Sequence, residues 1–455
     1  MKDYQNDYPD FRASPHHEHG DERPSNTSAN PTFYDVIETH VARRGFLMGG
    51  MAAIATGIFG SSLTGRAALA QTASPSGLLG FTPVPVSLED KVIVPAGYKV
   101  QVLAPWGTPV TGDMPAYVPG GATGAAQGAQ VGSHHDGMSF FAIEGSNDNG
   151  LLVFNHEYVE PRYMHAVKWA GQALDGETVV YTADGKRDDD EVLAEINAHG
   201  CTVARITKGA DGTWAIVADP MNRRITGLTE MAISGPAAGS AHLMTKFSPD
   251  GTKTRGTLNN CANGHTPWNT YMTAEENWAG YFVSPGEQPR EHARYGVSDE
   301  ATRYGWDKAA SAADEYTRFN ATATGASAAE DYRNEPNTFG WMVEFDPFDP
   351  ASVPVKRTAL GRFAHEGVVF APAVAGQPIV CYSGDDSRFE YIYKFVSAQP
   401  YDPATASGAL LDDGTLYVAK FNEDGTGEWL ALAPGQNGLT PENGFADLAD
   451  ILVNT

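Results

Sequence analysis

The chain has 455 residues, of which 42% are hydrophobic and 19% charged, with 31 Lys and Arg against 56 Asp and Glu. The formal net charge of −25 opposes binding to nucleic acid or to an anionic membrane surface, so both are excluded as primary functions. The three cysteines are an odd number, so at least one thiol stays unpaired even in an oxidising compartment.

The first feature in chain order is an export signal. Arg43 and Arg44 precede an apolar stretch that ends at a small-x-small site, residues 68–70. The apolar run is too short and too rich in Gly and Ala for a transmembrane helix, so we expect a cleaved twin-arginine signal. Residues 1–70 are therefore predicted to be an N-terminal extension and signal peptide, and residues 71–455 one domain.

This signal predicts where the protein works. The twin-arginine route exports folded proteins, which agrees with a chain that folds around a metal before export. We expect the twin-arginine export machinery as a partner, and the periplasm or the cell exterior as the location. No other segment approaches the ~20 apolar residues that a membrane span needs, so no membrane span is expected.

Short strands joined by tight turns recur along the rest of the chain. Residues 201–217, 242–258 and 416–432 each place an Asp-Gly turn between alternating segments, which predicts three hairpins. Further strands are expected within residues 151–158, 340–350, 378–386 and 391–396, and short helices within residues 183–199 and 298–331.

These elements predict an all-β fold. Many short hairpins in one long domain favour a β-propeller with loop and short-helix insertions, and a sandwich or jelly roll is the alternative. A propeller gathers loops from all its blades around a central channel. Ligands far apart in the sequence can therefore meet there.

The segment from Asn259 to Trp278 is the richest in potential metal ligands. Cys261 is a soft ligand suited to iron or zinc, whereas Glu275 and Glu276 are hard ligands suited to calcium. Cys201 and Cys381 lie in strand-like runs and are expected to be buried core thiols. Cys261, in a turn between polar residues, is the thiol that we assign to chemistry. The segment predicts a site for two kinds of metal.

Polar groups cluster at the ends of strand-like runs. Glu157 and Glu366 each follow a His where a strand opens into a loop, so each could bridge two cations, and His156 or His365 could ligate or orient them. The five segments that show this pattern are residues 134–136, 155–157, 261–276, 365–366 and 385–390.

One arginine stands among these carboxylates. If residues 388–390 are extended, Arg388 and Glu390 share a face, and the Arg388 fork could bind two oxygens of an anionic substrate. The alternative for this pair is a buried salt bridge.

Sequence patterns of other hydrolases and nucleotide-binding proteins are absent: there is no GxSxG, Walker, GxGxxG, CxxC or HExxH motif.

On these motifs the chain resembles the PhoX family of secreted alkaline phosphatases. The resemblance spans nearly the whole chain. Besides the twin-arginine leader, it rests on residues 97–99, 106–107, 155–158, 222–224, 234–239, 260–264, 275–277, 361–363, 365–366, 384–386 and 388–395.

The resemblance implies a six-bladed propeller that hydrolyses phosphate monoesters, with iron and calcium in its channel. It implies that Cys261 is the thiolate ligand to iron, that Glu366 ligates or bridges the metals, and that Arg388 binds the phosphate. Catalysis is thus expected from these three residues. The resemblance further implies that calcium is bound by carboxylate oxygens of Glu157, Glu276, Asp385 and Glu390.

Two departures from the family pattern accompany the resemblance. Asn269 stands where many relatives have Gly, and relatives continue beyond Thr455 through a further site carboxylate and the closing blades. We therefore expect an incomplete propeller. We also expect the protein to be a monomer.

Two other functions stay open from the residues alone. One is a calcium-dependent propeller of the lactonase or phosphotriesterase kind, which needs no thiolate, and the other is a non-catalytic binding propeller stabilised by metals.

Overall fold

The computed structural model describes residues 81–112, 117–170 and 179–455. The predicted signal and N-terminal extension lie outside these residues. Within the described part, no helix is long and apolar enough to cross a membrane. The described chain divides into a larger unit, residues 104–420 with 428–455, and a smaller one, residues 81–103 with 421–427. In the smaller unit, residues 81–103 form neither helix nor strand.

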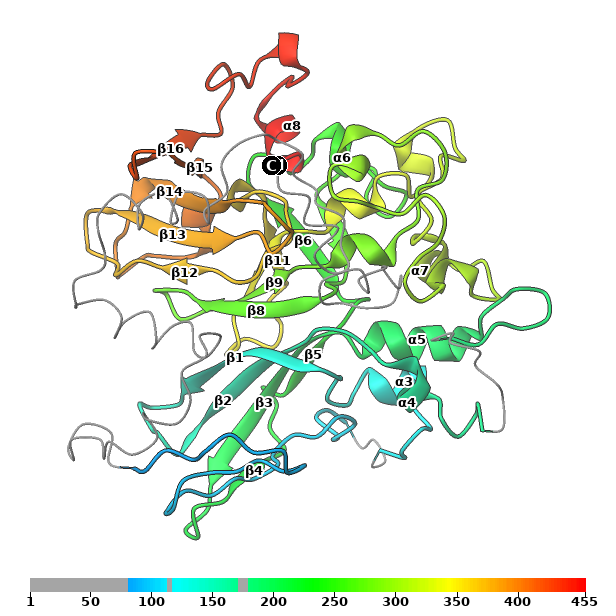
Figure 1. Ribbon diagram of the computed structural model, residues 1–455, viewed down its shortest axis with the longest axis vertical. Helices are drawn as coiled ribbons and strands as arrows, with labels where there is room; N and C mark the ends of the chain where they lie inside the picture. The colour runs from blue at the N-terminus through cyan, green and yellow to red at the C-terminus, as the bar shows by residue number, and fades with distance from the viewer. Residues whose placement is uncertain (1–80, 113–116, 171–178) are drawn as a thin grey trace, which may run out of the picture. The chain divides into compact units, whose positions relative to one another are not determined.

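The larger unit is built mainly from strands, with short helices between them (Figure 1). Asp188 caps the first turn of α5, because its carboxylate accepts hydrogen bonds from the Asp190 and Glu191 amides. The α-helices are α3 (Gly124–Gln127), α4 (Pro161–Met164), α5 (Asp189–Asn197), α6 (Arg290–Ala293), α7 (Asp314–Thr317) and α8 (Leu448–Val453). The 3₁₀ turns are η1 (Ala241–Leu243), η2 (Trp278–Tyr281), η3 (Trp306–Lys308), η4 (Ala328–Glu330), η5 (Glu335–Thr338), η6 (Thr358–Leu360), η7 (Gly408–Leu411) and η8 (Pro441–Asn443).

The strands form three sheets. The first has the order β1-β2-β3-β4, with β5 also paired to β3, and is antiparallel throughout. Its strands are β1 (His135–Ala142), β2 (Asn149–His156), β3 (Gly200–Lys208), β4 (Trp214–Ile216) and β5 (Arg223–Ile225).

The second sheet has the order β7-β6-β11-β10-β9-β8, and its β6–β11 pair is parallel. Its strands are β6 (Glu230–Ser234), β7 (Lys253–Arg255), β8 (Asn260–His265), β9 (Tyr271–Glu275), β10 (Met342–Phe345) and β11 (Val355–Arg357). The third sheet has the order β12-β13-β14-β15-β16. Its strands are β12 (Val369–Phe370), β13 (Pro378–Gly384), β14 (Ile392–Pro400), β15 (Gly414–Phe421) and β16 (Gly427–Ala431).

The second sheet is buried on both faces by the other two. Side chains alternate between the faces of a strand. On β9, Tyr271 packs in a core with first-sheet residues such as Val153, whereas Met272 packs in a core with third-sheet residues such as Phe395. All residues of β9 and β10 are buried as a result. The sheets therefore stack as layers, with β9 and β10 in the middle.

Strand β8 is the element at which all three sheets meet. Gly137 of β1 lies so close to β8 that a Cβ atom there would stand 2.7 Å from the backbone of Ala262. On β8 itself, a Cβ atom at Gly264 would stand 2.4 Å from a methyl group of Val368, just before β12. In Figure 1, β8 runs between β1 and β12. Glycine is required at both positions because a side chain would push the layers apart.

Most of the expected elements are present. The hairpins at residues 201–217 and 416–432 are β3–β4 and β15–β16. The prediction of a hairpin at residues 242–258 was wrong. Residues 241–243 form η1, and β7 pairs with β6 instead. The structure confirms a β-rich fold with few helices.

Candidate metal centre

The candidate site lies where strands of the first two sheets begin or end close to β8. Asp136 is the second residue of β1, and Glu157 directly follows β2. Cys261 is the second residue of β8, and Glu276 directly follows β9. Residues at strand ends can turn their side chains into a shared space without breaking a sheet. The segments that contain these four residues were all prominent in the sequence pattern.

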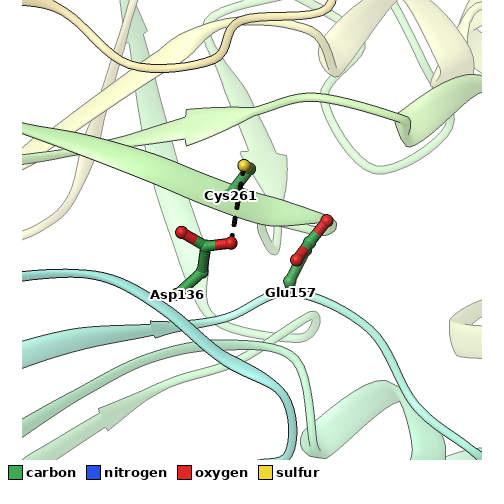
Figure 2. Close-up of side chains that lie close together, drawn as sticks. All are labelled: Asp136, Glu157 and Cys261. Atoms are coloured by element: carbon green, nitrogen blue, oxygen red, sulfur yellow. Dashed lines mark hydrogen bonds between the residues drawn. The ribbon is translucent and has the colours of Figure 1, made fainter. Parts of the chain in front are cut away.

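Two overlapping groups of donor atoms meet at the Cys261 sulfur. In the first, ligand atoms of Asp136, Glu157 and Cys261 all lie within 4.8 Å of one another. Figure 2 shows these side chains gathered around the thiol, which donates a hydrogen bond of 3.6 Å to Asp136 Oδ2. In the second group, Cys261 lies within the same limit of Glu276 and Glu366. One sulfur atom therefore belongs to both groups.

Asp386 extends the second group. Its carboxyl group hydrogen-bonds with those of Glu276 and Glu366. Of these three residues Glu276 is buried, whereas Glu366 and Asp386 are exposed, so the group reaches from the interior to the surface. Asp136, Glu157, Cys261, Glu276, Glu366 and Asp386 are called the acidic cluster below.

Backbone hydrogen bonds hold Glu366 and Asp386 side by side. The Glu366 amide donates to the Gly384 carbonyl at 3.2 Å, and the Asp386 amide donates to the Ala364 carbonyl at 3.0 Å. The segment before β12 is thereby attached to the end of β13. This pairing explains how two carboxylates about 20 positions apart in the sequence share one place.

Burial and neighbouring carboxyl groups raise the pKa of the three glutamates in the cluster. Burial first, and then the charge of Asp136, raise the pKa of Glu157 from 4.5 to about 7. Burial and then the charge of Asp386 raise the pKa of Glu366 to about 7 as well. For Glu276, burial, the hydrogen bond with Asp386 and the charge of Glu157 raise the pKa well above its ordinary range. Without a cation, these groups retain protons that exposed carboxyls would lose.

Burial and the same carboxylate charges also affect the pKa of the Cys261 thiol. Burial raises its pKa most, followed by the charges of Glu276, Glu157 and Asp136. A thiolate beside several carboxylates is unfavourable unless a cation balances the charge. A buried thiol with acidic neighbours is therefore suited to metal binding, where the ion replaces the proton.

Asn155 holds the Cys261 backbone in place. Its side-chain amide donates to the Cys261 carbonyl at 2.5 Å and to the Ala262 carbonyl at 3.0 Å. Its Oδ1 atom accepts hydrogen bonds from the Tyr271 hydroxyl at 2.9 Å and the Cys201 thiol at 3.3 Å. Cys201 and Cys381 are buried core thiols, as predicted.

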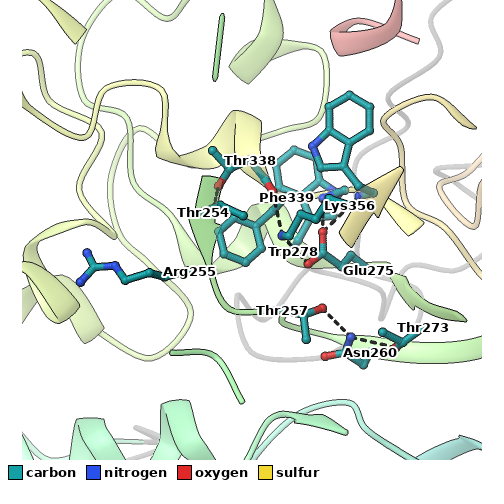
Figure 3. Close-up of polar contacts among 12 residues, drawn as sticks. Thr254, Arg255, Thr257, Asn260, Thr273, Glu275, Trp278, Thr338, Phe339 and Lys356 are labelled. Carbon is teal, nitrogen blue, oxygen red and sulfur yellow. Dashed lines mark hydrogen bonds and ion pairs between the residues drawn. The ribbon is translucent and has the colours of Figure 1, made fainter. Parts of the chain in front are cut away.

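The adjacent residues Glu275 and Glu276 have different surroundings. Glu275 is fully buried, and Figure 3 shows its carboxylate beside Lys356, with a Nζ–Oε1 distance of 2.7 Å. Its second oxygen accepts hydrogen bonds from the Gly340 and Trp341 amides. Both carboxylate oxygens are bonded within the core, so Glu275 does not join the acidic cluster and Glu276 does.

The two histidines next to cluster residues also bond to protein groups. His156 Nε2 accepts from the Gly132 amide and lies 2.7 Å from Thr202 Oγ1. His365 Nδ1 lies 2.9 Å from Ser383 Oγ. Burial lowers the pKa of both rings, that of His365 to about 3. Both rings are therefore neutral, and neither belongs to the two donor groups.

Three of the expected site residues lie within residues 385–390 and belong to neither donor group. Asp385 accepts a hydrogen bond from the Ser387 amide at 2.9 Å, and burial and then the charge of Glu390 raise its pKa to about 7. The Glu390 side chain is buried and accepts two hydrogen bonds from Arg294, at 2.8 and 2.9 Å. The side chain of Arg388 is exposed.

Sequence reasoning did not single out Asp136 and Asp386. Both stood within segments that the pattern identified, but the choice between neighbouring polar residues needs the strand register. Arg303 was also missed. Its positive charge lowers the pKa of Glu157, which places a cationic side chain near the cluster. No motif surrounds Arg303 in the sequence, so no signal could have found it.

In the described residues, a β-rich fold thus brings together two groups of donor atoms that could hold metal ions and that share one thiol. The family model described as "Alkaline phosphatase PhoX" matches residues 79–455. The chain therefore belongs to the PhoX alkaline phosphatase family.

A solved structure is similar as well. It is described as "Pseudomonas fluorescens PhoX in complex with vanadate, a transition state analogue", with 38% sequence identity and a TM-score of 0.71. The match covers 82% of this chain and 62% of that one, so the chain spans less than two thirds of that relative's length. No curated protein matches the chain.

Proposed function

We propose that this protein is a metal-dependent alkaline phosphatase that hydrolyses phosphate monoesters and scavenges phosphate. The observation that carries the proposal is the Cys261 sulfur, which both donor groups of the acidic cluster share. Family membership supports it, as does the similar protein from Pseudomonas fluorescens that was solved with vanadate, a transition-state analogue.

The donor atoms fit iron and calcium together. Thiolate is a ligand for iron but a poor one for calcium, and carboxylates suit calcium. We assign Cys261 and Glu366 to the iron side, and Glu157 and Glu276 to the calcium side or to bridging positions. Asp136 and Asp386 are added as further ligands because of their places in the cluster.

Asp385 and Glu390 are proposed as outer calcium ligands, as the resemblance implies. Glu390 forms an ion pair with Arg294, so it would have to release Arg294 in order to bind calcium. Asp385 is next to Asp386 in the chain, so it lies within reach of the same ions.

Bound cations would supply Lewis acidity and positive charge, which stabilise the charge that develops on a phosphoryl group during displacement. The chain's own contribution is to bind and orient the ester. Arg388 is suited to this task, because its side chain is exposed and its planar guanidinium can bind two phosphate oxygens.

Arg388 lies two residues after Asp386, a member of the acidic cluster, and its side chain is exposed. A phosphate held there would sit beside the cluster carboxylates, whose negative charge would repel it unless cations balance that charge. Substrate binding is thus expected to require the metals as well as the arginine.

The finer features of the fold and the location belong to the same proposal. The three stacked sheets are consistent with neighbouring blades of a six-bladed propeller, with the acidic cluster at its channel. We further propose a monomer that the twin-arginine machinery delivers to the periplasm or the cell exterior, as the motif at Arg43 and Arg44 suggests.

Replacing Cys261 tests the proposal against a calcium-only propeller. Cys261→Ser should lose iron, and its kcat/KM for 4-nitrophenyl phosphate should fall at least a hundredfold. Cys381→Ala, which alters a core thiol outside the cluster, should retain both metal and activity. Metal content is measured by mass spectrometry, and hydrolysis of a phosphotriester and a lactone is measured in parallel. Near-wild-type monoester hydrolysis by Cys261→Ser would defeat the iron–thiolate assignment.

A second variant separates an enzyme from a binding protein. Arg388→Ala should abolish turnover of the monoester while the metal content stays that of the wild type, because Arg388 belongs to neither donor group. Full turnover by this variant would remove Arg388 from the site.

A further inference from the structure

The turn from Ser387 to Glu390 directly follows Asp386 of the acidic cluster and contains two exposed residues. The Glu390 amide donates a hydrogen bond of 3.1 Å to the Ser387 carbonyl, which closes a four-residue turn. Arg388 and Phe389 occupy its two central positions. Both are exposed, and 49% of Phe389 is accessible to solvent.

Both ends of this turn are fixed. Before it, Asp386 hydrogen-bonds with the carboxyl groups of Glu276 and Glu366. After it, the Glu390 carboxylate is fully buried against Arg294. The two central residues are therefore held between a cluster carboxylate and a buried ion pair, which restricts where their side chains can lie.

Phe389 has a backbone conformation that its side chain disfavours. Its φ of +68° lies in the left-handed region, where a turn of this kind normally places Gly or Asn. His134 and Asn259, each two residues before a cluster residue, also have positive φ angles, of 49° and 51°. Strained residues of this kind gather at functional sites, where the surrounding structure enforces them.

We propose that Phe389 is a specificity-determining residue whose ring packs against the leaving group of the phosphate ester. This inference rests on the proposed function. Adjacent Cα atoms are about 3.8 Å apart, so a side chain next to the phosphate-binding Arg388 is placed to meet the group attached to the phosphate. A flat aromatic ring gains most from another ring, so the preferred substrates are phosphate monoesters of aromatic alcohols rather than of small polyols.

The test is the ratio of kcat/KM for 4-nitrophenyl phosphate to kcat/KM for glycerol 2-phosphate, measured with the full metal-loaded chain. Phe389→Leu should lower this ratio about threefold to tenfold, the range expected for one lost aromatic contact. Tyr163→Leu is the matched control, because Tyr163 is an aromatic residue of α4 with 71% exposure and lies outside the cluster. An unchanged ratio in Phe389→Leu would overturn the inference.

A binding measurement separates this inference from the proposed function. By calorimetry, phenylphosphonate should bind the wild type more tightly than methylphosphonate does, and Phe389→Leu should remove the difference. Phe389→Gly, which suits the turn, should remove it too without lowering the Tm. Equal binding of both phosphonates to the wild type overturns the role of Phe389. Preferential binding without hydrolysis of either ester supports that role and contradicts the phosphatase assignment.

Discussion

At the scale of single residues, Cys261 differs from the other cysteines through its neighbours. All three thiols are buried, and burial raises the pKa of Cys201 and of Cys381 to about 12. Only around Cys261 do several carboxylates add to the effect of burial. A cation in contact with the sulfur would reverse this effect, because it stabilises the thiolate and the carboxylates together.

Asp386 and Asp385 give a residue-scale prediction. Asp386→Asn removes a charge that contacts Glu276 and Glu366, so calcium affinity should fall about tenfold to a hundredfold. Asp385→Asn keeps an oxygen that can accept from the Ser387 amide and should have a smaller effect. Calcium titration of the chelated protein by calorimetry measures both. A larger loss in Asp385→Asn would reverse the assignment of the two neighbours.

The sequence identified most of the segments that form the site, but not every member. Glu157 and Glu366 could be selected because each follows a strand-like run, and Glu276 because it lies in a segment rich in potential ligands. Cys261 was selected as a thiol between polar residues, although the predicted turn was wrong, since Cys261 lies in β8. The choice of Asp386 over Asp385 could not be made, because it depends on a backbone bridge formed with a segment about 20 positions away.

At the scale of elements, the buried pair of Glu275 and Lys356 supports the end of β9. Lys356 Nζ contacts Glu275 Oε1 and the Thr338 carbonyl, each at 2.7 Å, and lies 3.9 Å from the centre of the Phe339 ring. Burial raises the pKa of Glu275 and lowers that of Lys356 despite their pairing. Desolvation therefore outweighs attraction, as is common for buried pairs.

Removing one partner of this pair should destabilise the fold strongly. Lys356→Met leaves the Glu275 carboxylate buried without a cation, so the free energy of unfolding should fall by about 3–5 kcal/mol. The control is Lys420→Met, because Lys420 and Glu428 form an exposed pair, and the expected loss there is under about 1 kcal/mol. Urea unfolding measures both. Equal losses in the two variants would contradict the supporting role.

Adding Glu275→Gln to Lys356→Met should recover part of the lost stability. The amide oxygen of Gln can still accept hydrogen bonds from the Gly340 and Trp341 amides, and no buried charge remains.

Element prediction succeeded where local signals were strong. Alternation and Asp-Gly turns located β3, β4, β15 and β16, since these strands pair with their neighbours in sequence. It failed at residues 242–258, where the same signals were present. There β7 pairs with β6, and β6 also pairs with the distant β11. Such long-range pairing leaves no local mark in the sequence.

At the scale of the whole molecule, the acidic cluster is a local concentration of the chain's excess negative charge. Carboxyl groups gathered in the interior oppose folding when they ionise, unless cations are bound. Metal binding and stability should therefore be linked in this protein.

The pH dependence of the metal-free protein tests that link. The folded pKa of Glu157, about 7, lies above its ordinary value of 4.5, so its contribution to stability is complete below pH 4.5 and is lost as the pH rises to about 7. In chelator, Glu157→Gln should gain stability relative to the wild type as the pH rises from about 5 to about 8, by up to about 3 kcal/mol. Buried histidines titrate equally in both proteins and cancel in the difference.

Restoring calcium should make the wild type more stable than Glu157→Gln, because Gln lacks the negative charge that is proposed to bind the ion. Thermal unfolding at both pH values, with chelator and with calcium, measures this effect. A constant difference under all four conditions would show that Glu157 is not a metal ligand.

The acidic cluster is proposed to bind metals and, with them, to hydrolyse phosphate monoesters. The most direct test is the rate of 4-nitrophenyl phosphate hydrolysis by the full chain as purified, after chelation, and after iron and calcium are restored, with metal content measured at each stage. We predict activity that is lost on chelation and regained with the metals. Hydrolysis that persists in protein shown to be free of metal, or none in protein shown to be loaded, would contradict this role of the cluster.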